Sequence, residues 1–534
     1  MKLTIEHVID LVDQLPKNNL YDYVSGGKNK AKLIGVNRDD QKLEIVRVNS
    51  DNSESGANMS KDVLEKLCSK VNSNQPFKFD SVLDGSGNTR STFEAIFAHT
   101  TEFYACKVDN VKHLIWVPQI KHEIGKICYY DTIKDKIKEL GLDFSTSINM
   151  AYRNYITAIK SKPFLLLAGI SGTGKSRIVR ELARACWDVG SNEYEAQKPR
   201  NFEMIQVKPN WHDSSELIGY VSRIGADQDG NGISFVVGDF LKFIAKAWGE
   251  PDVPYFLCLD EMNLAPEQYF AEYLSVIESR KVDMEGNVVT DPILKQNAQS
   301  WYWNLCTELT DDEKLRAQFR DKGISIPQNL IVVGTVNMDE TTFSFSRKVL
   351  DRAMTIEMND VDLYGGLTHR YEQIGKLSSE HLVGNAVEGV DVYESNKDVC
   401  DVVINYLQDI NKKLEGTPFK VAYRTRNEFL LYIVNNLPYN KDDSGEELSL
   451  DFVIARALDE ITNMKILSRI EGDETKVSVE FLTELENTIK RSLEAISHES
   501  FAKEQTENTH KSISLAKLSE MKKRLSSGYT SFWS

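Results

Sequence analysis

Apolar runs of strand length recur through the middle of the chain, at residues 164–168, 255–259 and 330–336. Each run is short, continuous and rich in large apolar side chains, which is typical of strands buried on both faces of a parallel sheet. Segments of helical composition separate the runs, such as residues 177–185 shortly after the first one. This alternation predicts an α/β domain with a parallel sheet over residues 145–360.

The pattern differs on either side of this domain. In residues 1–140, strand-like runs flank polar turns, which predicts a small N-terminal α+β or β-barrel-like module. A charged helical segment at residues 133–140 links this module to the α/β domain. In residues 361–534, helical periodicity dominates and predicts a C-terminal α-helical region. The elements predicted outside the α/β domain are hairpins at residues 33–48 and 103–117 and helices at residues 92–96, 402–414, 427–435, 452–470, 479–496 and 515–525.

The composition is that of an ordinary globular protein. The chain has 534 residues, which exceeds one hydrophobic core and suggests about two to four domains. No apolar run approaches the roughly 20 residues that a membrane helix needs, and the N-terminus does not fit a signal peptide. Seven cysteines are scattered singly without a CxxC pair, which argues against a disulfide framework or a zinc site. We therefore expect a cytoplasmic protein without a membrane segment.

The net charge of −16 is unevenly distributed. Residues 1–150 hold 20 Lys and Arg against 21 Asp and Glu, so nearly all the negative charge lies in residues 151–534. A near-neutral module can bind DNA through a local basic face even when the whole chain is acidic. The charge therefore neither supports nor excludes DNA binding.

The sequence GISGTGKS at residues 169–176 follows the first apolar run and has the form of a phosphate-binding loop. Glycines let backbone N–H groups approach phosphates, and the start of the following helix adds partial positive charge. A chance glycine-rich turn is disfavoured by the strand before it and the helix after it. Lys175 is expected to reach the β- and γ-phosphates, and Ser176 to offer a hydroxyl to Mg²⁺. The predicted triphosphate site consists of Gly169, Ser171, Gly172, Thr173, Gly174, Lys175 and Ser176.

Polar side chains end the other two apolar runs. Asp260 and Glu261 follow the second run, where adjacent carboxylates repel unless they are solvated or bound to a metal. Beside a phosphate loop, Asp260 is expected to bind Mg²⁺ and Glu261 to polarise the attacking water; two solvated loop acids are the alternative. Asn337 follows the third run and is expected to hold that water, although asparagine is also a common turn residue there.

Two arginines on a predicted helix after the third run are candidates for contact with a neighbouring subunit. Arg352 is the first choice and Arg347 the second for a side chain that stabilises charge on the neighbour's γ-phosphate. The alternative for Arg352 is a surface salt bridge with Asp351 or Asp339.

These features together resemble the AAA+ family, and most closely its McrB-type branch, the motors of modification-dependent and related restriction systems. The similarity covers about residue 150 to residue 534. The segments that carry it are residues 206–211, 257–265, 334–340 and 348–353 in the α/β domain and residues 423–428, 465–472 and 528–533 in the helical lid and tail.

The resemblance implies a hexameric ring with nucleotide at the subunit interfaces, an McrC-like nuclease partner and a preference for GTP. In the lid, Arg424 is expected to contact phosphate, with Arg426 or a pairing with lid acids as alternatives. Two positions depart from the branch: Asn337 and Asp339 are two rather than three residues apart, and Leu264 replaces an arginine. Both GTP and ATP therefore remain candidate nucleotides, together with Mg²⁺.

A further hairpin is predicted inside the α/β domain. Residues 220–224 and 233–237 flank a turn rich in Asp and Gly, directly before a helix at residues 239–248. The resemblance implies that such an insert points at the central pore, and the alternative is a surface hairpin without that role.

By its position in this family, the N-terminal module is expected to bind double-stranded DNA, although the module itself resembles no family firmly. The candidate residues are Arg90, Lys107, Lys112 and His113; Arg90 on a glycine-rich loop suits a phosphate or base-edge contact. Trp116 is more typical of a core residue than of a DNA contact.

The leading hypothesis is a ring motor that drives a partner nuclease in restriction and phage defence, since the chain shows no nuclease signature of its own. The alternative is a MoxR-like protein-remodelling AAA+ ATPase. A third possibility, a nucleotide-gated scaffold without hydrolysis, is disfavoured by the intact Glu261 and Asn337.

Overall fold

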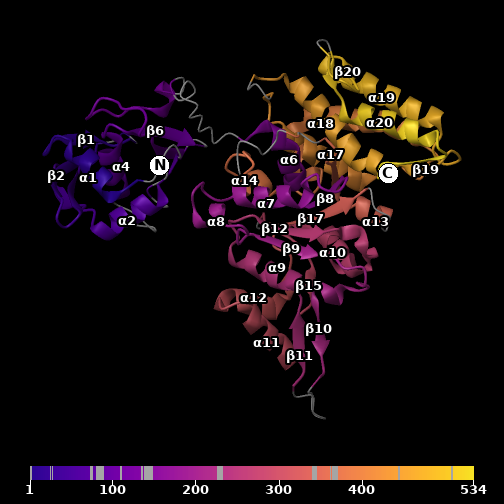
Figure 1. Ribbon diagram of the computed structural model, residues 1–534, viewed down its shortest axis with the longest axis horizontal. Coiled ribbons are helices and arrows are strands. Elements are labelled where there is room, and N and C mark those ends of the chain that lie inside the picture. Colours follow the sequence, from indigo (N-terminus) through magenta and orange to yellow (C-terminus); the bar gives the residue numbers. More distant parts are fainter. Residues whose placement is uncertain are drawn as a thin grey trace. The chain divides into compact units, whose positions relative to one another are not determined.

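The computed structural model divides into two compact units, which are described separately (Figure 1). The N-terminal unit comprises Met1–Ser147 with Val189–Asn192, and the C-terminal unit comprises Ile148–Asp188 and Glu193–Ser534. The residues described by the structure are 3–24, 26, 28–71, 76–77, 79, 89–108, 111–133, 136, 148–224, 232–284, 286–338, 345–360, 363, 371–442, 446–506 and 509–533. Most of the helical link predicted at residues 133–140 lies outside them.

The N-terminal unit is an α+β module with two antiparallel sheets of strand orders β1-β2-β3-β4 and β5-β7-β6. Both predicted hairpins are confirmed, as β2–β3 and β6–β7. Helix α4 packs against strands of both sheets, and its Phe97 shares a buried core with Leu33 and Phe103. The elements are α1 (Ile5–Asp13), β1 (Leu20–Asp22), β2 (Lys30–Asn37), β3 (Lys42–Val48), β4 (Glu54–Gly56), α2 (Lys61–Lys70), β5 (Pro76–Phe77), α4 (Arg90–Ala98), β6 (Phe103–Val108), β7 (Val111–Trp116) and the 3₁₀ turn η1 (Tyr130–Thr132).

A five-stranded parallel sheet forms the centre of the C-terminal unit, with the order β18-β8-β17-β12-β9. All six residues of β8 are buried; Leu165 and Leu167 face one core, and Phe164 and Leu166 face the other. The three predicted apolar strands are confirmed as β8, β12 and β17. The strands are β8 (Phe164–Gly169), β9 (Phe202–Gln206), β12 (Tyr255–Asp260), β17 (Leu330–Asn337) and β18 (Met354–Glu357).

Helices and short strands surround this sheet and connect its strands. They are η2 (Met150–Tyr152), α6 (Arg153–Ser161), α7 (Lys175–Ala185), α8 (Asn192–Glu195), η3 (Ser214–Glu216), α9 (Asp239–Gly249), η4 (Met262–Leu264), η5 (Glu267–Phe270), α10 (Ala271–Val276), η6 (Ile277–Ser279), β13 (Lys281–Val282), β14 (Val288–Val289), β15 (Pro292–Leu294), β16 (Ile324–Ser325) and α13 (Arg347–Leu350).

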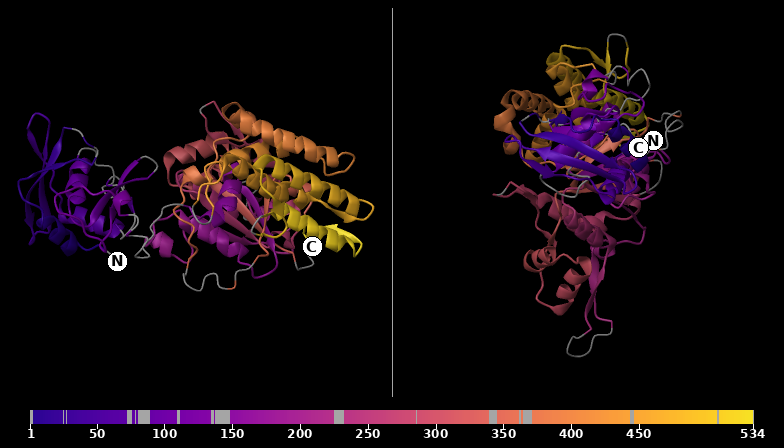
Figure 2. Two further views of the ribbon diagram at one scale, coloured as in Figure 1. Left: turned by 90° about the horizontal axis from the view of Figure 1, so that it is seen from above. Right: turned by 90° about the vertical axis from the view of Figure 1, so that its left-hand side faces the viewer.

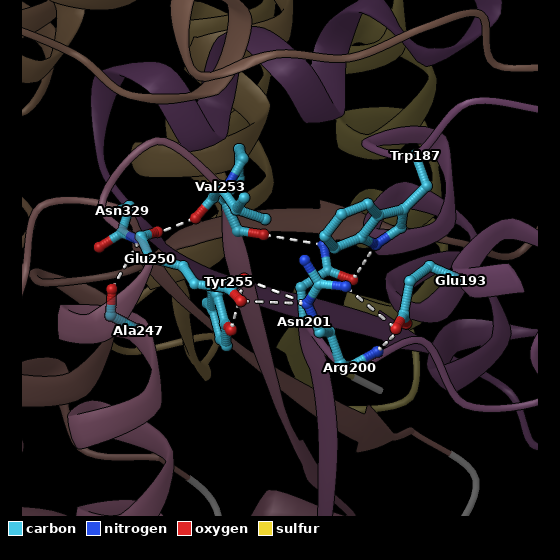
Figure 3. A network of polar contacts seen from close by, with 10 residues as sticks. Trp187, Glu193, Arg200, Asn201, Ala247, Glu250, Val253, Tyr255 and Asn329 are labelled. Atoms are coloured by element: carbon cyan, nitrogen blue, oxygen red, sulfur yellow. Dashed lines mark hydrogen bonds and ion pairs between the residues drawn. The ribbon is translucent and has the colours of Figure 1, made fainter. Parts of the chain in front are cut away.

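Two buried asparagines tie the amino ends of neighbouring strands together (Figure 3). The amide nitrogen of Asn201 donates to the carbonyl oxygens of Ala183 (3.0 Å) and Pro254 (2.8 Å). The amide nitrogen of Asn329 donates to carbonyl oxygens at the end of α9 and before β12, including Val253 at 2.7 Å. Because these amides satisfy backbone oxygens that would otherwise be buried without partners, they fix where β12 enters the sheet.

The predicted internal hairpin is confirmed as β10 (Gly219–Ser222) and β11 (Ser234–Val237). It projects from the sheet beside α11 (Ser300–Leu309) and α12 (Glu313–Lys322) (Figures 1 and 2). Phe235 stacks on Trp301 of α11, with ring centroids 5.5 Å apart and an interplanar angle of 15°. This stack fixes the hairpin to α11, while Tyr220, Val221 and Val236 remain exposed.

The C-terminal part of this unit is helical, as predicted, and its last three long helices lie side by side (Figures 1 and 2). Ser449, Ser478 and Ser512 each accept a backbone hydrogen bond at the start of one of these helices, which explains where the helices begin. Helix α18 ends at Lys465, earlier than the predicted residue 470, and a 3₁₀ turn follows. The helices are α14 (Ser379–Leu382), α15 (Val390–Tyr393), η7 (Glu394–Asn396), α16 (Lys397–Lys413), α17 (Tyr423–Asn436), α18 (Leu450–Lys465), η8 (Leu467–Arg469), α19 (Val479–Ser497) and α20 (Ile513–Leu525).

Short strands close this lid. Strand β22 (Tyr529–Ser531) pairs antiparallel with β19 (Glu471–Asp473), and β20 (Phe501–Ala502) pairs with β21 (His510–Lys511). The indole nitrogen of Trp533 donates to the carbonyl oxygen of Ser468 at 2.9 Å. Two of the three lid and tail segments that carry the sequence resemblance, those near residues 470 and 530, therefore lie next to each other. Within the part of the chain that the structure describes, no helix is long and apolar enough to cross a bilayer.

Candidate functional site

The predicted phosphate loop connects the carboxyl end of β8 to the amino end of α7. Gly172 and Gly174 have φ angles of +85° and +84°, which side chains with a Cβ rarely adopt, so these glycines are required for the loop conformation. A Cβ on Gly169 would lie 2.6 Å from the carbonyl oxygen of Met358. Asn359, after β18, accepts a hydrogen bond from the backbone N–H of Ile170 at 3.0 Å. The loop is therefore braced from β18 while the first N–H groups of α7 point toward it.

Lys175 is the first residue of α7 and is only 6% exposed. Its Nζ donates to the carbonyl oxygens of Gly169 (2.9 Å) and Ile170 (2.7 Å), so the ammonium group lies inside the loop. A positive charge at this place, beside a helix amino terminus, attracts the phosphates of a nucleotide.

Three oxygen-bearing side chains meet beside this lysine. The Ser176 hydroxyl donates to Oδ1 of Asp260, and the Thr335 hydroxyl donates to the same oxygen at 2.9 Å. A serine hydroxyl next to a carboxylate is the hard oxygen donor set that Mg²⁺ takes, together with phosphate oxygens and water. Ser176 and Asp260 therefore fit a nucleotide-bound Mg²⁺.

Glu261 has a left-handed backbone with a φ angle of 53°, which is strained for a residue with a side chain. Its backbone N–H donates to Oγ1 of Thr335 at 2.9 Å, and its carboxylate accepts from Nδ2 of Asn337 at 3.2 Å. The structure thus brings Glu261, the predicted water-activating acid, into direct contact with Asn337, the predicted water-holding amide.

Thr335 was not singled out from the sequence, although it links Asp260 to the backbone of Glu261. The signal was a threonine inside the otherwise apolar strand β17, two positions before Asn337. Because side chains two apart in a strand lie on the same face, Thr335 and Asn337 reach toward the same neighbouring strand end.

Arg352 lies toward the end of the sheet opposite to the phosphate loop. Arg352 lies two residues before β18, whose first residue Met354 pairs with Leu165 of β8, whereas the phosphate loop follows the other end of β8. At about 3.3 Å per residue, Leu165 lies about 17 Å along the sheet from the point where the chain leaves β8 and enters the phosphate loop. Arg352 is 8% exposed, forms an ion pair with Glu278, and donates to the carbonyl oxygen of Lys348 at 2.6 Å. The salt-bridge alternative named Asp351 or Asp339, but the observed partner is Glu278; Asp339 lies outside the described residues.

Among the other arginines, Arg424 shares its partner with Arg352, whereas Arg347 and Arg426 have different contacts. Arg424, in the first turn of α17, pairs with the same Glu278 as Arg352 does. Among the contacts of the described residues, Arg424 is thus joined to Arg352 rather than to the phosphate loop, so its expected role toward phosphate stays a prediction. Arg347 lies over the ring of Phe419, 5.1 Å from its centroid, and Arg426 bonds Asn427.

In the N-terminal unit, Arg90 is the first residue of helix α4 and not part of the glycine-rich loop, because the helix begins earlier than expected. Lys107 and Lys112 face each other across β6 and β7, but their side chains lie outside the described residues. His113 is partly buried on β7. Trp116 is buried and donates to Glu102 at 3.0 Å, which confirms it as a core residue. The DNA contacts therefore stay predictions.

A parallel sheet of this strand order, with a phosphate loop after β8 and an acid pair after β12, defines a P-loop nucleoside triphosphatase domain. Residues 164–353 match the family described as AAA domain (dynein-related subfamily), and the chain thus contains an AAA domain followed by a helical region. Residues 380–529 match a family described as "domain of unknown function (DUF8727)".

Part of the chain is also similar to a curated protein, the type II restriction enzyme NmeDI of Neisseria meningitidis serogroup C. The two are 30% identical over 145 residues, which cover 24% of this chain and 40% of that enzyme. The match therefore spans less than half of the enzyme's length.

Proposed function

We propose that this chain is the motor subunit of a restriction system of the McrB type. It hydrolyses GTP or ATP with Mg²⁺ in a hexameric ring, binds double-stranded DNA through its N-terminal unit, and drives an McrC-like nuclease in phage defence. The sequence motifs of the lid, the AAA domain and the partial identity to a protein named as a restriction enzyme support this proposal. A MoxR-like protein-remodelling ATPase is the alternative.

The chemistry follows from the residues at the carboxyl ends of β8, β12 and β17. Lys175 and the N–H groups of α7 bind the β- and γ-phosphates, and Asn337 orients a water molecule for in-line attack. Glu261 accepts the proton of that water as the water oxygen bonds to the γ-phosphorus. The bond from this phosphorus to the oxygen that bridges it to the β-phosphate breaks at the same time, and the nucleoside diphosphate leaves. Ser176 and Asp260 would hold Mg²⁺, which would supply charge neutralisation of the phosphate oxygens.

The position of Arg352 is the observation that carries the ring proposal. Its segment lies about 17 Å along the sheet from the phosphate loop of the same chain, so its guanidinium serves a nucleotide only if that nucleotide is bound to another subunit. An arginine supplied by a neighbour stabilises the charge that develops on the transferred phosphoryl group.

Mixing two inactive variants tests this arrangement. Lys175→Ala removes the phosphate contact of one subunit, and Arg352→Ala removes the arginine, each lowering turnover by about a thousandfold. A mixture is expected to regain activity, because an Arg352→Ala subunit binds nucleotide and receives an intact Arg352 from a Lys175→Ala neighbour. No recovery, with both variants folded and co-assembled, contradicts a shared site.

DNA binding separates the restriction motor from the remodelling ATPase. In a gel-shift assay, the full chain is expected to bind double-stranded DNA at low ionic strength and to release the DNA as salt is raised. It is also expected to hydrolyse nucleotide faster when DNA is present. Turnover with GTP and with ATP, measured in parallel, identifies the nucleotide. Absence of any salt-sensitive DNA binding counts against the restriction proposal and favours a protein client.

A further inference from the structure

One lid segment carries sequence similarity but no role so far, residues 465–472. Its first residue, Lys465, ends helix α18 and has 0% exposure. Its Nζ donates to the carbonyl oxygens of Leu350 (3.2 Å), Asp351 (2.9 Å) and Ala353 (2.8 Å). These carbonyls belong to the core segment that contains Arg352, so a lid lysine binds the backbone on both sides of that arginine.

A second lid residue reaches the same segment. Arg469, four positions after Lys465 in the 3₁₀ turn η8, forms an ion pair with Asp351, with 3.2 Å between Nε and Oδ1. Asp351 is the residue directly before Arg352. The backbone and the neighbouring side chain of the arginine are therefore both held by the lid.

A third lid residue meets the side chain of Arg352 through a shared acid. Glu278, in the core turn η6, forms ion pairs with Arg352 and with Arg424 of α17. Three basic residues from two lid elements and the turn after them thus converge on the arginine segment or on its carboxylate partner.

Lys465 is itself held in place by a buried carboxylate. Glu428 of α17 pairs with Lys465 at 2.7 Å and also with Lys162, which lies just before β8. Burial lowers the pKa of Lys465 to about 8. For Glu428, burial raises the pKa, but the two lysines lower it by more, so the pKa lies below its usual value. A buried, charged arrangement of this kind is a poor way to gain stability, because apolar residues of similar size serve as well. Its geometry, aimed at three carbonyls, favours a positioning role.

On the basis of the function proposed above, we infer that Lys465 and Arg469 are positioning residues. They hold the segment that contains Arg352 against the lid of its own subunit. The direction in which the arginine is presented to the neighbouring nucleotide then depends on where that lid lies. A lid that shifts with the nucleotide of its own site changes the turnover of the next site.

The variant Lys465→Met tests this inference, because it keeps the unbranched side chain and removes the donor. We expect unchanged nucleotide binding and assembly, and kcat lowered about tenfold or more with KM nearly unchanged, because only transition-state charge stabilisation is lost. Lys490→Met is the matched control, since Lys490 is a half-exposed lysine on lid helix α19. Normal turnover of Lys465→Met overturns the inference.

Mixed rings distinguish positioning from simple damage. Lys465→Met subunits mixed with Lys175→Ala subunits are expected to regain turnover, because the latter offer a correctly mounted Arg352 to the intact nucleotide sites of the former. A folded Lys465→Met that is inactive and not rescued overturns the inference. If the mixture of Arg352→Ala and Lys175→Ala also shows no recovery of turnover, the shared nucleotide site itself is refuted, and not only the positioning of Arg352 by the lid.

A second variant covers the case in which Lys465→Met does not fold. Asp351→Asn keeps the shape of a partly exposed residue and removes its negative charge, which weakens its ion pair with Arg469 and its attraction to Lys465. Its kcat is expected to fall by severalfold and to be rescued in the same mixture. If Lys465→Met does not fold and Asp351→Asn has the kcat of the wild type, the positioning role of Arg469 is overturned.

Discussion

At the scale of single residues, the site depends on one hydroxyl and one strained backbone. Thr335 donates to Asp260 and accepts from the N–H of Glu261, so it joins the proposed Mg²⁺ ligand to the proposed water-activating residue. Glu261 keeps a left-handed backbone that an unstrained turn would avoid. The two features belong together, because the hydrogen bond to Thr335 fixes the strained residue.

Thr335→Val keeps the shape of the side chain and removes the hydroxyl. It leaves the N–H of Glu261 without its partner, at a cost of about 1–3 kcal/mol, so kcat is expected to fall by about tenfold to a hundredfold. Nucleotide binding is expected to persist, and Thr335→Ser to restore most of kcat. Steady-state kinetics measure kcat, and equilibrium binding measures the nucleotide affinity. If Thr335→Ser has a kcat as low as that of Thr335→Val, the hydroxyl is not what the site requires.

The strain at Glu261 has its own test. Glu261→Gly and Glu261→Ala both remove the carboxylate, and only the alanine keeps a Cβ on a left-handed backbone. The glycine variant is expected to unfold at a higher temperature, by the equivalent of about 1 kcal/mol, while both lack hydrolysis. Equal thermal midpoints would falsify the assignment of strain to this residue.

At the scale of elements, the lid segment that mounts Arg352 is braced by a small sheet. Strand β22 pairs with β19 directly after η8, and Trp533 donates to Ser468 within that turn. Trp533 also packs against both hydrophobic cores of this unit. The turn that carries Arg469 is therefore fixed by residues more than sixty positions away in the sequence.

Trp533→Ala removes this packing and the hydrogen bond. The thermal midpoint of the C-terminal unit is expected to fall by the equivalent of about 2 kcal/mol for a partly buried tryptophan, and turnover to fall with it. Trp533→Phe retains the ring and is expected to lose less than half as much. Calorimetry and a turnover assay provide the comparison, and an unchanged midpoint for the alanine variant contradicts the bracing role.

The same scale shows why some elements were predicted and others were not. Strands β8, β12 and β17 are buried on both faces and so form continuous apolar runs. The edge strands β9 and β18 were not singled out: only the first residue of β9 is buried, its other residues being partly or well exposed, and β18 has only four residues. The contacts of Lys465 with residues 350–353 could not be predicted either, because helical periodicity does not say which segments more than 110 positions apart meet.

At the scale of the whole molecule, the chain consists of two compact units with separate cores, and the nucleotide residues all belong to the C-terminal unit. The phosphate loop, the acid pair and Asn337 were predictable because each follows an apolar strand, and carboxyl ends of parallel strands share one edge. The ion-pair partner of Arg352 was not predictable, because Glu278 lies in a short turn with no motif around it.

Nucleotide with Mg²⁺ is expected to stabilise only the C-terminal unit. Saturation at about a hundred times the dissociation constant corresponds to about 2.7 kcal/mol, visible as a higher midpoint of one of two thermal transitions. Removing Mg²⁺ with a chelator is expected to reverse most of the shift, and Lys175→Ala to abolish it. A shift of both transitions by the same amount runs against separate units.

Strand β8 is paired with β17 along its whole length and with β18 over residues 165–168. Amide protons in such a strand exchange with deuterium only when the whole unit opens, whereas those of the loop that follows exchange through local motion. The phosphate loop is thus attached to backbone that serves as an internal standard. Labelling experiments can therefore follow ligand-dependent changes at Gly172 and Gly174 against a background that stays silent on the same time scale.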